Sequence, residues 1–364
     1  MKIKGAVVFE KSGKFSIEKL ELSDPRENEV LVRVAAAGIC HTDLAARDQY
    51  LPIPLPGVLG HEGAGVVEKV GARVKKVKPG DHVVMTWGHC GVCPSCVEGN
   101  QVWCSEFFPK NFFGVRPDGT TTIQKDDQPI HGSFFCQSSF ANFALGEELS
   151  VVKVRDDVPL EMLAPMGCGV MTGAGAVMNS FHSRPGASLA VFGSGTVGMS
   201  AILAAVVCGY TTIIAVDLHP DRLEMAKKLG ATHTVNAKKD NPVEAIQKIT
   251  GGGADYSLEC VGNAIVMRQA HDSLRIGGVC GLVGAAPTGM EAGLDMQTML
   301  NGRTIKGIIE GDAIPDLFIP KLIELYSQRK FPFDRLIKYY PFDEINKAVE
   351  DMEKGAVIKP VLKF

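Results

Sequence analysis

The chain has 364 residues and a formal net charge of −3, and 45% of its residues are hydrophobic while 22% are charged. This length exceeds one ordinary hydrophobic core and predicts a globular protein of two domains. The lack of a basic run argues against nucleic acid as a partner, and the apolar stretches are shorter than the roughly 20 residues that a membrane span needs.

The N-terminal stretch and the cysteines indicate the compartment. Met1–Gly5 begin neither a long apolar run nor a small-residue cleavage site, so we expect no signal peptide. The ten cysteines are unevenly placed, and four of them crowd into one loop. Crowded cysteines without an export signal favour metal binding in a reducing compartment, and we therefore expect a cytoplasmic protein.

The first 150 or so residues show the pattern of a β-rich domain. Strands are predicted at Val30–Val34, at Gly63–Val70 and, after the turn Lys78–Asp81, at His82–Met85. Short strands separated by Gly and Pro predict an antiparallel, barrel-like domain. Residues 105–135 are irregular and polar, and we expect them to form a surface excursion.

Near residue 170 the pattern changes to strands that alternate with helices, which predicts a parallel sheet with right-handed crossovers. Beyond residue 310 we expect a further helix and a last strand. The predicted strands are Ser188–Phe192, Thr212–Val216, Tyr256–Cys260, Val279–Val283 and Ala356–Leu362, and the predicted helices are Met199–Cys208, Asp221–Leu229 and Ile319–Gln328.

A glycine motif follows the strand Ser188–Phe192. Gly193, Gly195 and Gly198 suit a tight turn, a close approach to a pyrophosphate and close packing of helix on strand. Asp217 lies 19 residues beyond Gly198, at the end of the next strand, where a ribose-binding carboxylate belongs. The motif predicts a site for NAD, although a glycine turn beside a solvated Asp remains the alternative.

Four cysteines lie within one loop at spacings that suit a metal. Cys90, Cys93, Cys96 and Cys104 offer four thiolates, which suit a closed tetrahedral zinc site with a structural role. An iron–sulfur cluster is the rival interpretation, because cysteines spaced two residues apart also hold clusters.

Cys40, His61 and Cys168 form a third candidate set, and each lies beside glycine or another polar residue. Spacing cannot bring them together, so buried cysteines and an ordinary histidine remain the alternative at this point. If they meet, two thiolates and one imidazole form a catalytic zinc site with an open position.

At these residues the sequence resembles the zinc-containing medium-chain dehydrogenase family over essentially its whole length, and within it most resembles the aryl-alcohol (benzyl alcohol) dehydrogenases. The stretches that carry the family resemblance are residues 38–43, 60–62, 90–104, 167–169, 193–198 and 302–307; those that carry the aryl-alcohol resemblance are residues 104–108, 138–141, 173–176 and 330–334.

The resemblance implies an α/β plus β-rich fold. A GroES-like catalytic domain is expected at residues 1–169 and 310–364, with the structural zinc loop at 90–104. A Rossmann domain, a doubly wound parallel sheet that binds NAD, is expected to be inserted at 170–309. It also implies two zinc ions per chain, a homodimer or homotetramer, and a small-molecule alcohol or aldehyde as substrate.

The resemblance further assigns roles to single residues. Cys40, His61 and Cys168 ligate the catalytic zinc, Glu62 is an occasional ligand or supporting group, and Asp43 orients His61. His41 and Lys359 approach the pyrophosphate, while Asp217 and Arg222 hold the adenosine ribose. Solvated surface charges remain the alternative for His41, Arg222 and Lys359.

One position departs from the family. Where many relatives end the proton relay with a histidine, this chain has Ala45. We expect Thr42 to accept the proton of the alcohol, and water or another group to complete the relay. Leu51, Trp87 and Phe140 are the candidates for an apolar substrate pocket, with ordinary core or rim aromatics as the alternative for the two rings.

The predicted activity is the reversible, NAD-dependent oxidation of an aromatic primary alcohol to its aldehyde. An allylic, geraniol-like or general primary alcohol is the alternative substrate. A polyol dehydrogenase, a zinc-free quinone reductase and a non-catalytic zinc-binding interaction protein are more distant alternatives, which zinc content and substrate range separate.

Overall fold

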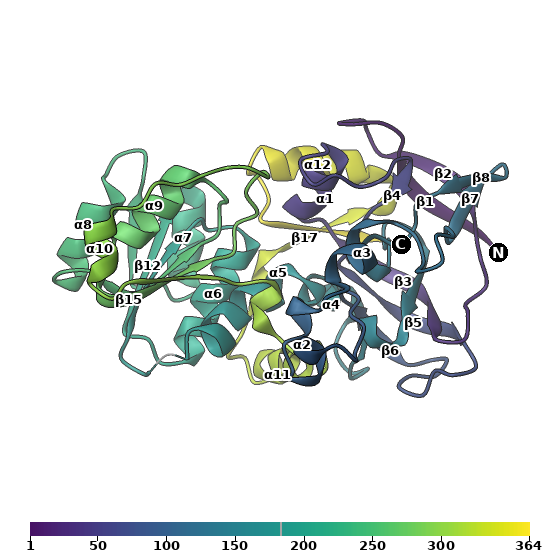
Figure 1. The fold of residues 1–364 in the computed structure, drawn as a ribbon, viewed down its shortest axis with the longest axis horizontal. Coiled ribbons are helices and arrows are strands. Elements are labelled where there is room, and N and C mark those ends of the chain that lie inside the picture. Colours follow the sequence, from purple (N-terminus) through teal and green to yellow (C-terminus); the bar gives the residue numbers. More distant parts are fainter. Residues whose placement is uncertain (183) are drawn as a thin grey trace. The chain divides into compact units, whose positions relative to one another are not determined.

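The computed structural model describes residues 1–182 and 184–364, and the chain divides into two compact units. The first unit comprises Met1–Cys168, Ile314–Lys321 and Leu336–Phe364, and the second comprises Gly169–Ala313 and Leu322–Arg335. Both ends of the chain, purple and yellow in Figure 1, therefore contribute to the first unit.

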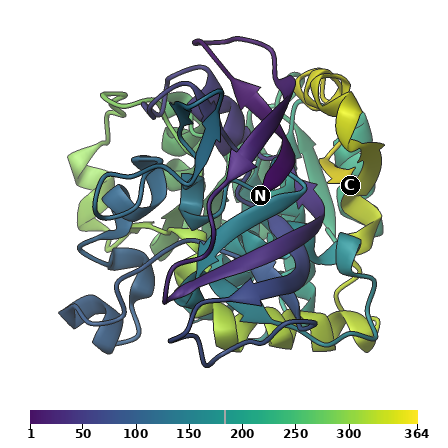
Figure 2. The ribbon, with the colours of Figure 1, turned by 90° about the vertical axis from the view of Figure 1, so that its right-hand side faces the viewer.

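The first unit contains two mostly antiparallel sheets. The two N-terminal strands, drawn purple in Figure 2, pair with each other in one of these sheets. One sheet has the spatial order β4 (Gly57–Val58), β1 (Lys2–Val8), β2 (Ser16–Leu22), β7 (Ile123–Lys125) and β8 (Gln128–Ile130). The other has the order β10 (Val151–Lys153), β6 (His82–Met85), β5 (Gly63–Val70), β3 (Glu29–Gly38), β18 (Lys359–Lys363) and β17 (Ile337–Pro341), with β9 (Phe143–Glu147) paired to β3.

The predicted strands β5 and β6 have the bounds expected from the sequence, whereas β3 runs on to Gly38. Its small residues Ala36 and Ala37 pair with Ala64 and Gly63 of β5, so tertiary pairing overrides the weak strand propensity of alanine. The extension of β3 matters for the site, because it carries the chain directly to Cys40. The helices of this unit are α1 (His41–Arg47), α2 (Pro94–Val97), α3 (Phe107–Phe112), α4 (Leu160–Leu163) and α12 (Ile345–Glu353).

The expectation of a surface excursion at residues 105–135 is wrong at both ends of that range. Helix α3 forms near its start, and a 3₁₀ turn, Phe134–Cys136, begins at its end. Phe112, Phe134 and Phe135 are buried there, because their rings pack on one another. This aromatic packing is long-range in sequence, so local polarity did not reveal it.

The second unit is built on one parallel sheet, as the alternation of strands and helices predicts. Its order is β13 (His233–Asn236), β12 (Thr212–Asp217), β11 (Ser188–Phe192), β14 (Ala254–Glu259), β15 (Leu274–Leu282) and β16 (Thr304–Gly307). Its helices are α5 (Gly169–Gly175), α6 (Thr196–Val207), α7 (Pro220–Lys228), α8 (Pro242–Thr250), α9 (Ala264–Asp272) and α10 (Met296–Leu300).

This order is that of a doubly wound Rossmann sheet, in which the chain reverses direction along the sheet between β11 and β14. Ligands of such sheets bind beyond the carboxyl ends of the strands at that reversal. The glycine motif follows β11 and therefore lies at this edge.

The last part of the chain also follows the prediction with shifted bounds. Helix α11 spans Pro315–Ser327 and so begins before Ile319, while β18 begins at Lys359 and not at Ala356. Among the described residues, no single helix is long and apolar enough to cross a membrane; the bent pair Leu160–Gly167 and Gly169–Ser180 passes the same test by length and composition only.

Candidate functional site

The first unit brings together four side chains that lie far apart in the sequence. Cys40 follows β3, His61 and Glu62 precede β5, and Cys168 follows the 3₁₀ turn Ala164–Gly167. One ligand atom from each of the four lies within 4.8 Å of the others. The three predicted ligands of a catalytic zinc therefore meet, and the carboxylate of Glu62 joins them.

A buried carboxylate organises two of these side chains. Asp43 accepts hydrogen bonds from the Cys40 backbone N–H at 2.9 Å and from the Gly60 N–H at 3.1 Å, and its Oδ1 lies 2.8 Å from Nδ1 of His61. Because Nδ1 is held by Asp43, Nε2 is the nitrogen of His61 that can face an ion. That Nε2 atom is buried without a hydrogen-bond partner.

The protonation of the cluster suits a cation. The neighbouring Cys168 thiol is the largest influence on Cys40 and, with the charge of Lys359, holds the pKa of Cys40 well below its ordinary value. Burial alone would lower the pKa of His61, but the carboxylate of Asp43 raises it well above the ordinary value. A thiolate, an orphaned imidazole nitrogen and a second thiol form a donor set that fits zinc.

Lys359 lies beside the cluster and is buried. Its Nζ lies 2.9 and 2.8 Å from the two carboxylate oxygens of Glu62 and donates to the Ile39 carbonyl at 3.0 Å. Burial raises the pKa of Glu62. Burial alone would lower the pKa of Lys359, but the nearby negative charges, that of Glu62 first, raise it. A Cβ at Gly38 would lie 2.0 Å from Glu62 Oε2, which explains why glycine stands there. The sequence suggested a contact with pyrophosphate for Lys359 and did not reveal this ion pair.

An aromatic wall, Phe112, Phe134 and Phe135, covers one side of His61. The ring of Phe135 stacks on the imidazole at 4.7 Å, and the ring of Phe134 meets it edge-on at 5.7 Å. Phe112 packs against both phenylalanines. Sequence analysis missed all three rings, although the doublet Phe134–Phe135 was a visible apolar signal in a polar stretch.

The three residues that the sequence predicts for the substrate pocket are buried or half-buried. Phe140 is fully buried, and its ring packs edge-on against Phe15 at 5.6 Å. Trp87 is buried with no hydrogen-bond partner for its Nε1, and Leu51 is half-buried. Their role in a substrate pocket stays a prediction.

The residues at the start of α1 lie next to the cluster. Cys40 Sγ lies 3.7 Å from Thr42 Oγ1, within hydrogen-bonding distance for sulfur, so the Thr42 hydroxyl is within reach of the cluster. His41 is exposed, and Ala45 is half-buried on the same helix.

Cys90, Cys93, Cys96 and Cys104 form a second cluster, in which one sulfur from each lies within 4.8 Å of the others. Backbone N–H groups of Ser105 and Cys96 lower the pKa of Cys93 to about 6, whereas burial raises that of Cys96 to about 12. Four thiolates at this separation repel one another unless a cation lies between them, so this donor set also fits zinc. None of the ten cysteines, all of which lie within the described residues, forms a disulfide.

The glycine motif of the second unit has the geometry of a phosphate-binding turn. Gly193 has φ of 95°, and a Cβ at Gly198 would lie 1.9 Å from the Gly193 carbonyl oxygen. A Cβ at Gly195 would meet nothing within 4 Å, so a ligand can approach its backbone. Gly193 thus allows the tight turn, Gly198 allows the helix to pack closely on the strand, and Gly195 leaves its backbone open to a ligand.

Asp217 stands at the end of β12 beside this turn. Its Oδ2 accepts the Ser194 N–H at 2.7 Å and its Oδ1 accepts the His219 N–H at 2.9 Å. Arg222 lies in the first turn of α7, and its buried Nε has no hydrogen-bond partner. Both side chains therefore lie near the edge of the sheet where the ribose of a dinucleotide is expected.

Comparisons with known proteins agree with this geometry. Residues 26–156 match the family model of the alcohol dehydrogenase GroES-like domain, and residues 196–328 match that of the zinc-binding dehydrogenases. A geraniol dehydrogenase of Castellaniella defragrans is 43% identical over 362 residues, which cover 99% of this chain and 97% of the relative.

Two solved structures are similar over nearly their whole length. The benzyl alcohol dehydrogenase of Acinetobacter calcoaceticus is 48% identical with a TM-score of 0.97, covering 100% of this chain and 99% of that one. An alcohol dehydrogenase zinc-binding domain protein of Burkholderia ambifaria is 51% identical with a TM-score of 0.98 and the same coverage.

Proposed function

Because the chain belongs to the zinc-containing medium-chain alcohol dehydrogenase family, which uses NAD and zinc, we propose that it oxidises an aromatic primary alcohol reversibly to its aldehyde. The observation that carries this proposal is the contact of two phenylalanine rings with His61, Phe135 stacked on the imidazole and Phe134 edge-on to it. A substrate bound beside this imidazole meets flat apolar rings, which favour a ring or another conjugated group.

The roles of the residues follow from their contacts. Cys40, His61 and Cys168 would hold the catalytic zinc, and the loop of Cys90, Cys93, Cys96 and Cys104 would hold a structural one. When bound, zinc lowers the pKa of the alcohol hydroxyl and NAD accepts the hydride, so these two groups supply the reactive chemistry. Asp43 fixes the orientation of His61.

Thr42 Oγ1 receives the proton of the alcohol, because it is the hydroxyl in contact with Cys40. Ala45 carries no titratable group, so the proton leaves through water or another group. Glu62 is neutralised by Lys359 and supports the site from outside the ligand set. The predicted contact of Lys359 with the pyrophosphate would require its ammonium to leave Glu62.

In the second unit, Gly193, Gly195 and Gly198 receive the pyrophosphate, while Asp217 and Arg222 hold the adenosine ribose. His41 remains a candidate for a pyrophosphate contact. We assign residues 1–169 and 310–364 to the catalytic domain and 170–309 to the cofactor domain. The first limit lies next to the boundary between the two compact units at Cys168 and Gly169, whereas Leu322–Arg335 group with the second unit and not with the first.

An allylic terpenoid alcohol is the second candidate substrate, because a relative that is 43% identical is named a geraniol dehydrogenase. The deciding experiment compares kcat/KM for benzyl alcohol, geraniol and ethanol with NAD. We expect benzyl alcohol to exceed ethanol by at least about a hundredfold, since a buried ring contributes a few kcal/mol. Geraniol above benzyl alcohol would establish the second candidate, and ethanol above both would refute the aromatic wall as the substrate contact.

Two variants test whether the substrate contacts Phe135 or Phe140. Phe135→Ala should lower kcat/KM for benzyl alcohol by about tenfold or more while it changes that for ethanol little, because only the ring contact is lost. Phe140→Ala serves as the control; it should lower thermal stability, because it opens a cavity against Phe15 in the core. The reverse pattern would place the substrate at Phe140.

We also propose a homodimer or homotetramer in the cytoplasm. Within the described part of the chain, β16 pairs on one side only, and the nearby chain exposes Met296, Leu300 and Ile276. An unprotected strand edge with exposed apolar side chains favours association with a second copy. Light scattering of Leu300→Glu should show dissociation, and an unchanged mass would exclude this edge. The lack of disulfides among the ten cysteines of the described chain suits a reducing compartment.

A further inference from the structure

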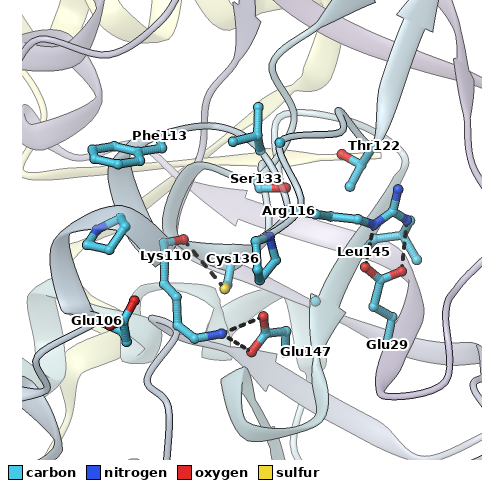
Figure 3. Close-up of a pocket in the computed structure, with 15 residues that line it drawn as sticks. Glu29, Glu106, Lys110, Phe113, Arg116, Thr122, Ser133, Cys136, Leu145 and Glu147 are labelled. Atoms are coloured by element: carbon cyan, nitrogen blue, oxygen red, sulfur yellow. Dashed lines mark hydrogen bonds and ion pairs between the residues drawn. The ribbon is translucent and has the colours of Figure 1, made fainter.

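The first unit contains a cavity that shares no residue with either cysteine cluster. Its volume is about 360 Å³, and it lies among the start of β3, helix α3, the loop after α3 and strand β9 (Figure 3). Its lining includes the buried side chains of Leu145 and Cys136 and the half-exposed side chain of Phe113.

Two ion pairs line this cavity, and both cations in it are already neutralised. Lys110 Nζ lies 2.7 Å from each carboxylate oxygen of Glu147. Arg116 binds Glu29 with two parallel contacts, Nε to Oε1 at 2.6 Å and Nη2 to Oε2 at 2.8 Å. Figure 3 shows the two pairs on either side of the Cys136 sulfur.

The charge balance of the lining selects against anions. Beside the two pairs, the lining includes the carboxylate of Glu106, so acidic groups exceed basic ones by one. Separating Arg116 from Glu29 would leave a buried charge without its opposite charge, which is costly. An incoming carboxylate or phosphate thus meets no free cation.

The remaining lining is mostly apolar and large enough for a ring. An apolar cavity of roughly 150 Å³ already admits benzene, and ligand sites in proteins usually measure about 300–1,000 Å³. Phe113, Pro109 and Leu145 offer flat or aliphatic surfaces, and the Ser133 hydroxyl offers one polar contact. These features suit a molecule with an apolar body and a single uncharged polar group.

We propose that this cavity is a second binding site for an uncharged, mainly apolar small molecule of the same chemical class as the substrate, an alcohol or aldehyde that carries a ring. The assignment to the substrate class rests on the proposed function, whereas the preference for an uncharged apolar ligand rests on the cavity alone.

The position of the site links it to the metal cluster. Phe135 stacks on His61, and the next residue, Cys136, contributes its thiol to the cavity. Helix α3 also contributes to both the wall and the cavity, because Phe112 belongs to the aromatic wall and Lys110 lines the cavity. The second site is therefore lined by the same two segments that form the aromatic wall.

The experiment measures binding and not turnover, so it remains informative if the enzyme prefers another substrate. Crystals of the zinc-loaded protein are soaked with 4-bromotoluene, and the anomalous signal of bromine locates the ligand. In solution, the affinities for 4-fluorotoluene, 4-fluorobenzyl alcohol and 4-fluorobenzoate are measured by ¹⁹F NMR.

Three variants of lining residues are compared with the wild type. Val115→Trp fills the cavity with a larger side chain, and Val115→Ala is its matched control. Phe113→Ala removes an aromatic contact and does not fill the cavity.

We expect bromine between Phe113 and Leu145 in the wild type and in Val115→Ala, and none there in Val115→Trp. Fluorobenzoate should bind at least about tenfold more weakly than fluorotoluene, because its carboxylate must lose water without gaining a cation. Zinc content and circular dichroism show whether Val115→Trp is folded; Phe113→Ala should weaken binding in any case. An empty cavity in the wild type, an affinity that Val115→Trp and Phe113→Ala both leave unchanged, or equal binding of fluorobenzoate would overturn the proposal. Tight binding of fluorotoluene with no binding of fluorobenzyl alcohol would overturn the assignment to the substrate class.

Discussion

The buried pair of Lys359 and Glu62 gives a prediction whose magnitude follows from its contacts. Lys359→Met preserves the length of the side chain but removes three contacts, two to Glu62 and one to the Ile39 carbonyl. Glu62 is fully buried and would lose the ammonium group that balances its charge. Removing one member of a buried ion pair costs about 3–5 kcal/mol, so we expect a loss of unfolding free energy in this range.

The measurement is equilibrium unfolding in urea, followed by tryptophan fluorescence. Both tryptophans, Trp87 and Trp103, belong to the first unit, so the signal reports the part of the chain that holds the pair. Lys338→Met is the matched control, because the Lys338 side chain is 56% exposed in its pair with Asp351. An exposed pair contributes about 0–1 kcal/mol, so this control should unfold close to the wild type.

A double-mutant cycle with Glu62→Gln tests whether the loss belongs to the pair. The double variant should be more stable than the sum of the single effects predicts, by about 1–3 kcal/mol, because neither residue is left charged and alone. Zinc content of every variant is measured in parallel, since Glu62 is adjacent to His61. Additive effects, or a Lys359→Met variant as stable as Lys338→Met, would refute this account of the pair.

Three further predictions concern the metal ions, the cofactor and the proton. Cys40→Ser should abolish turnover and leave a folded protein with one zinc, whereas Cys96→Ser should lose the other zinc and lower the unfolding midpoint; equal zinc loss in both variants would contradict two separate sites. NAD should exceed NADP in kcat/KM by orders of magnitude, and Asp217→Gly should narrow the gap while it raises the KM for NAD, because Asp217 also holds the Ser194 N–H; comparable rates with both cofactors in the wild type would refute the role of Asp217. Thr42→Ala should lower kcat at neutral pH by about a hundredfold, and Thr42→Ser should restore most of it; an unchanged pH profile in Thr42→Ala would exclude a relay through this hydroxyl.

The parts of the structure that depend on short stretches of sequence were predictable. The strands β5, β6 and β11, the glycine motif and the four-cysteine loop each depend on residues that are neighbours along the chain. Periodicity and spacing are sufficient there, because the chemistry and the local backbone geometry coincide. Fold class follows from the alternation of strands and helices in the same way.

The meeting of Cys40, His61 and Cys168 did not follow from spacing. It depends on the long strand β3, which carries Cys40 to the end of the sheet, and on the pairing of β3 with β5 next to His61. The family resemblance predicts these three residues as ligands, whereas their spacing along the chain does not. It supplied no partner for Lys359, whose pairing with Glu62 depends on β18 lying beside β3.

The aromatic wall was missed for a backbone reason. Spacing along the chain predicts Phe140 as a pocket residue, which stays a prediction, but it does not predict how the chain turns before this residue. Phe135, Cys136 and Ser138 have φ of 50°, 55° and 52°, in the left-handed region that non-glycine residues rarely adopt. Each such residue costs about 1–3 kcal/mol unless its surroundings compensate, and no local sequence pattern reveals that compensation.

The hydrogen bonds that compensate for this strain are long-range. The Ser138 hydroxyl donates to the Val58 carbonyl at 2.6 Å, and the Gln137 amide donates to the His61 carbonyl at 2.9 Å. The same segment that reaches back to His61 therefore turns Phe134 and Phe135 toward the imidazole and leaves Phe140 in the core, so substrate selectivity should respond to changes at Phe135.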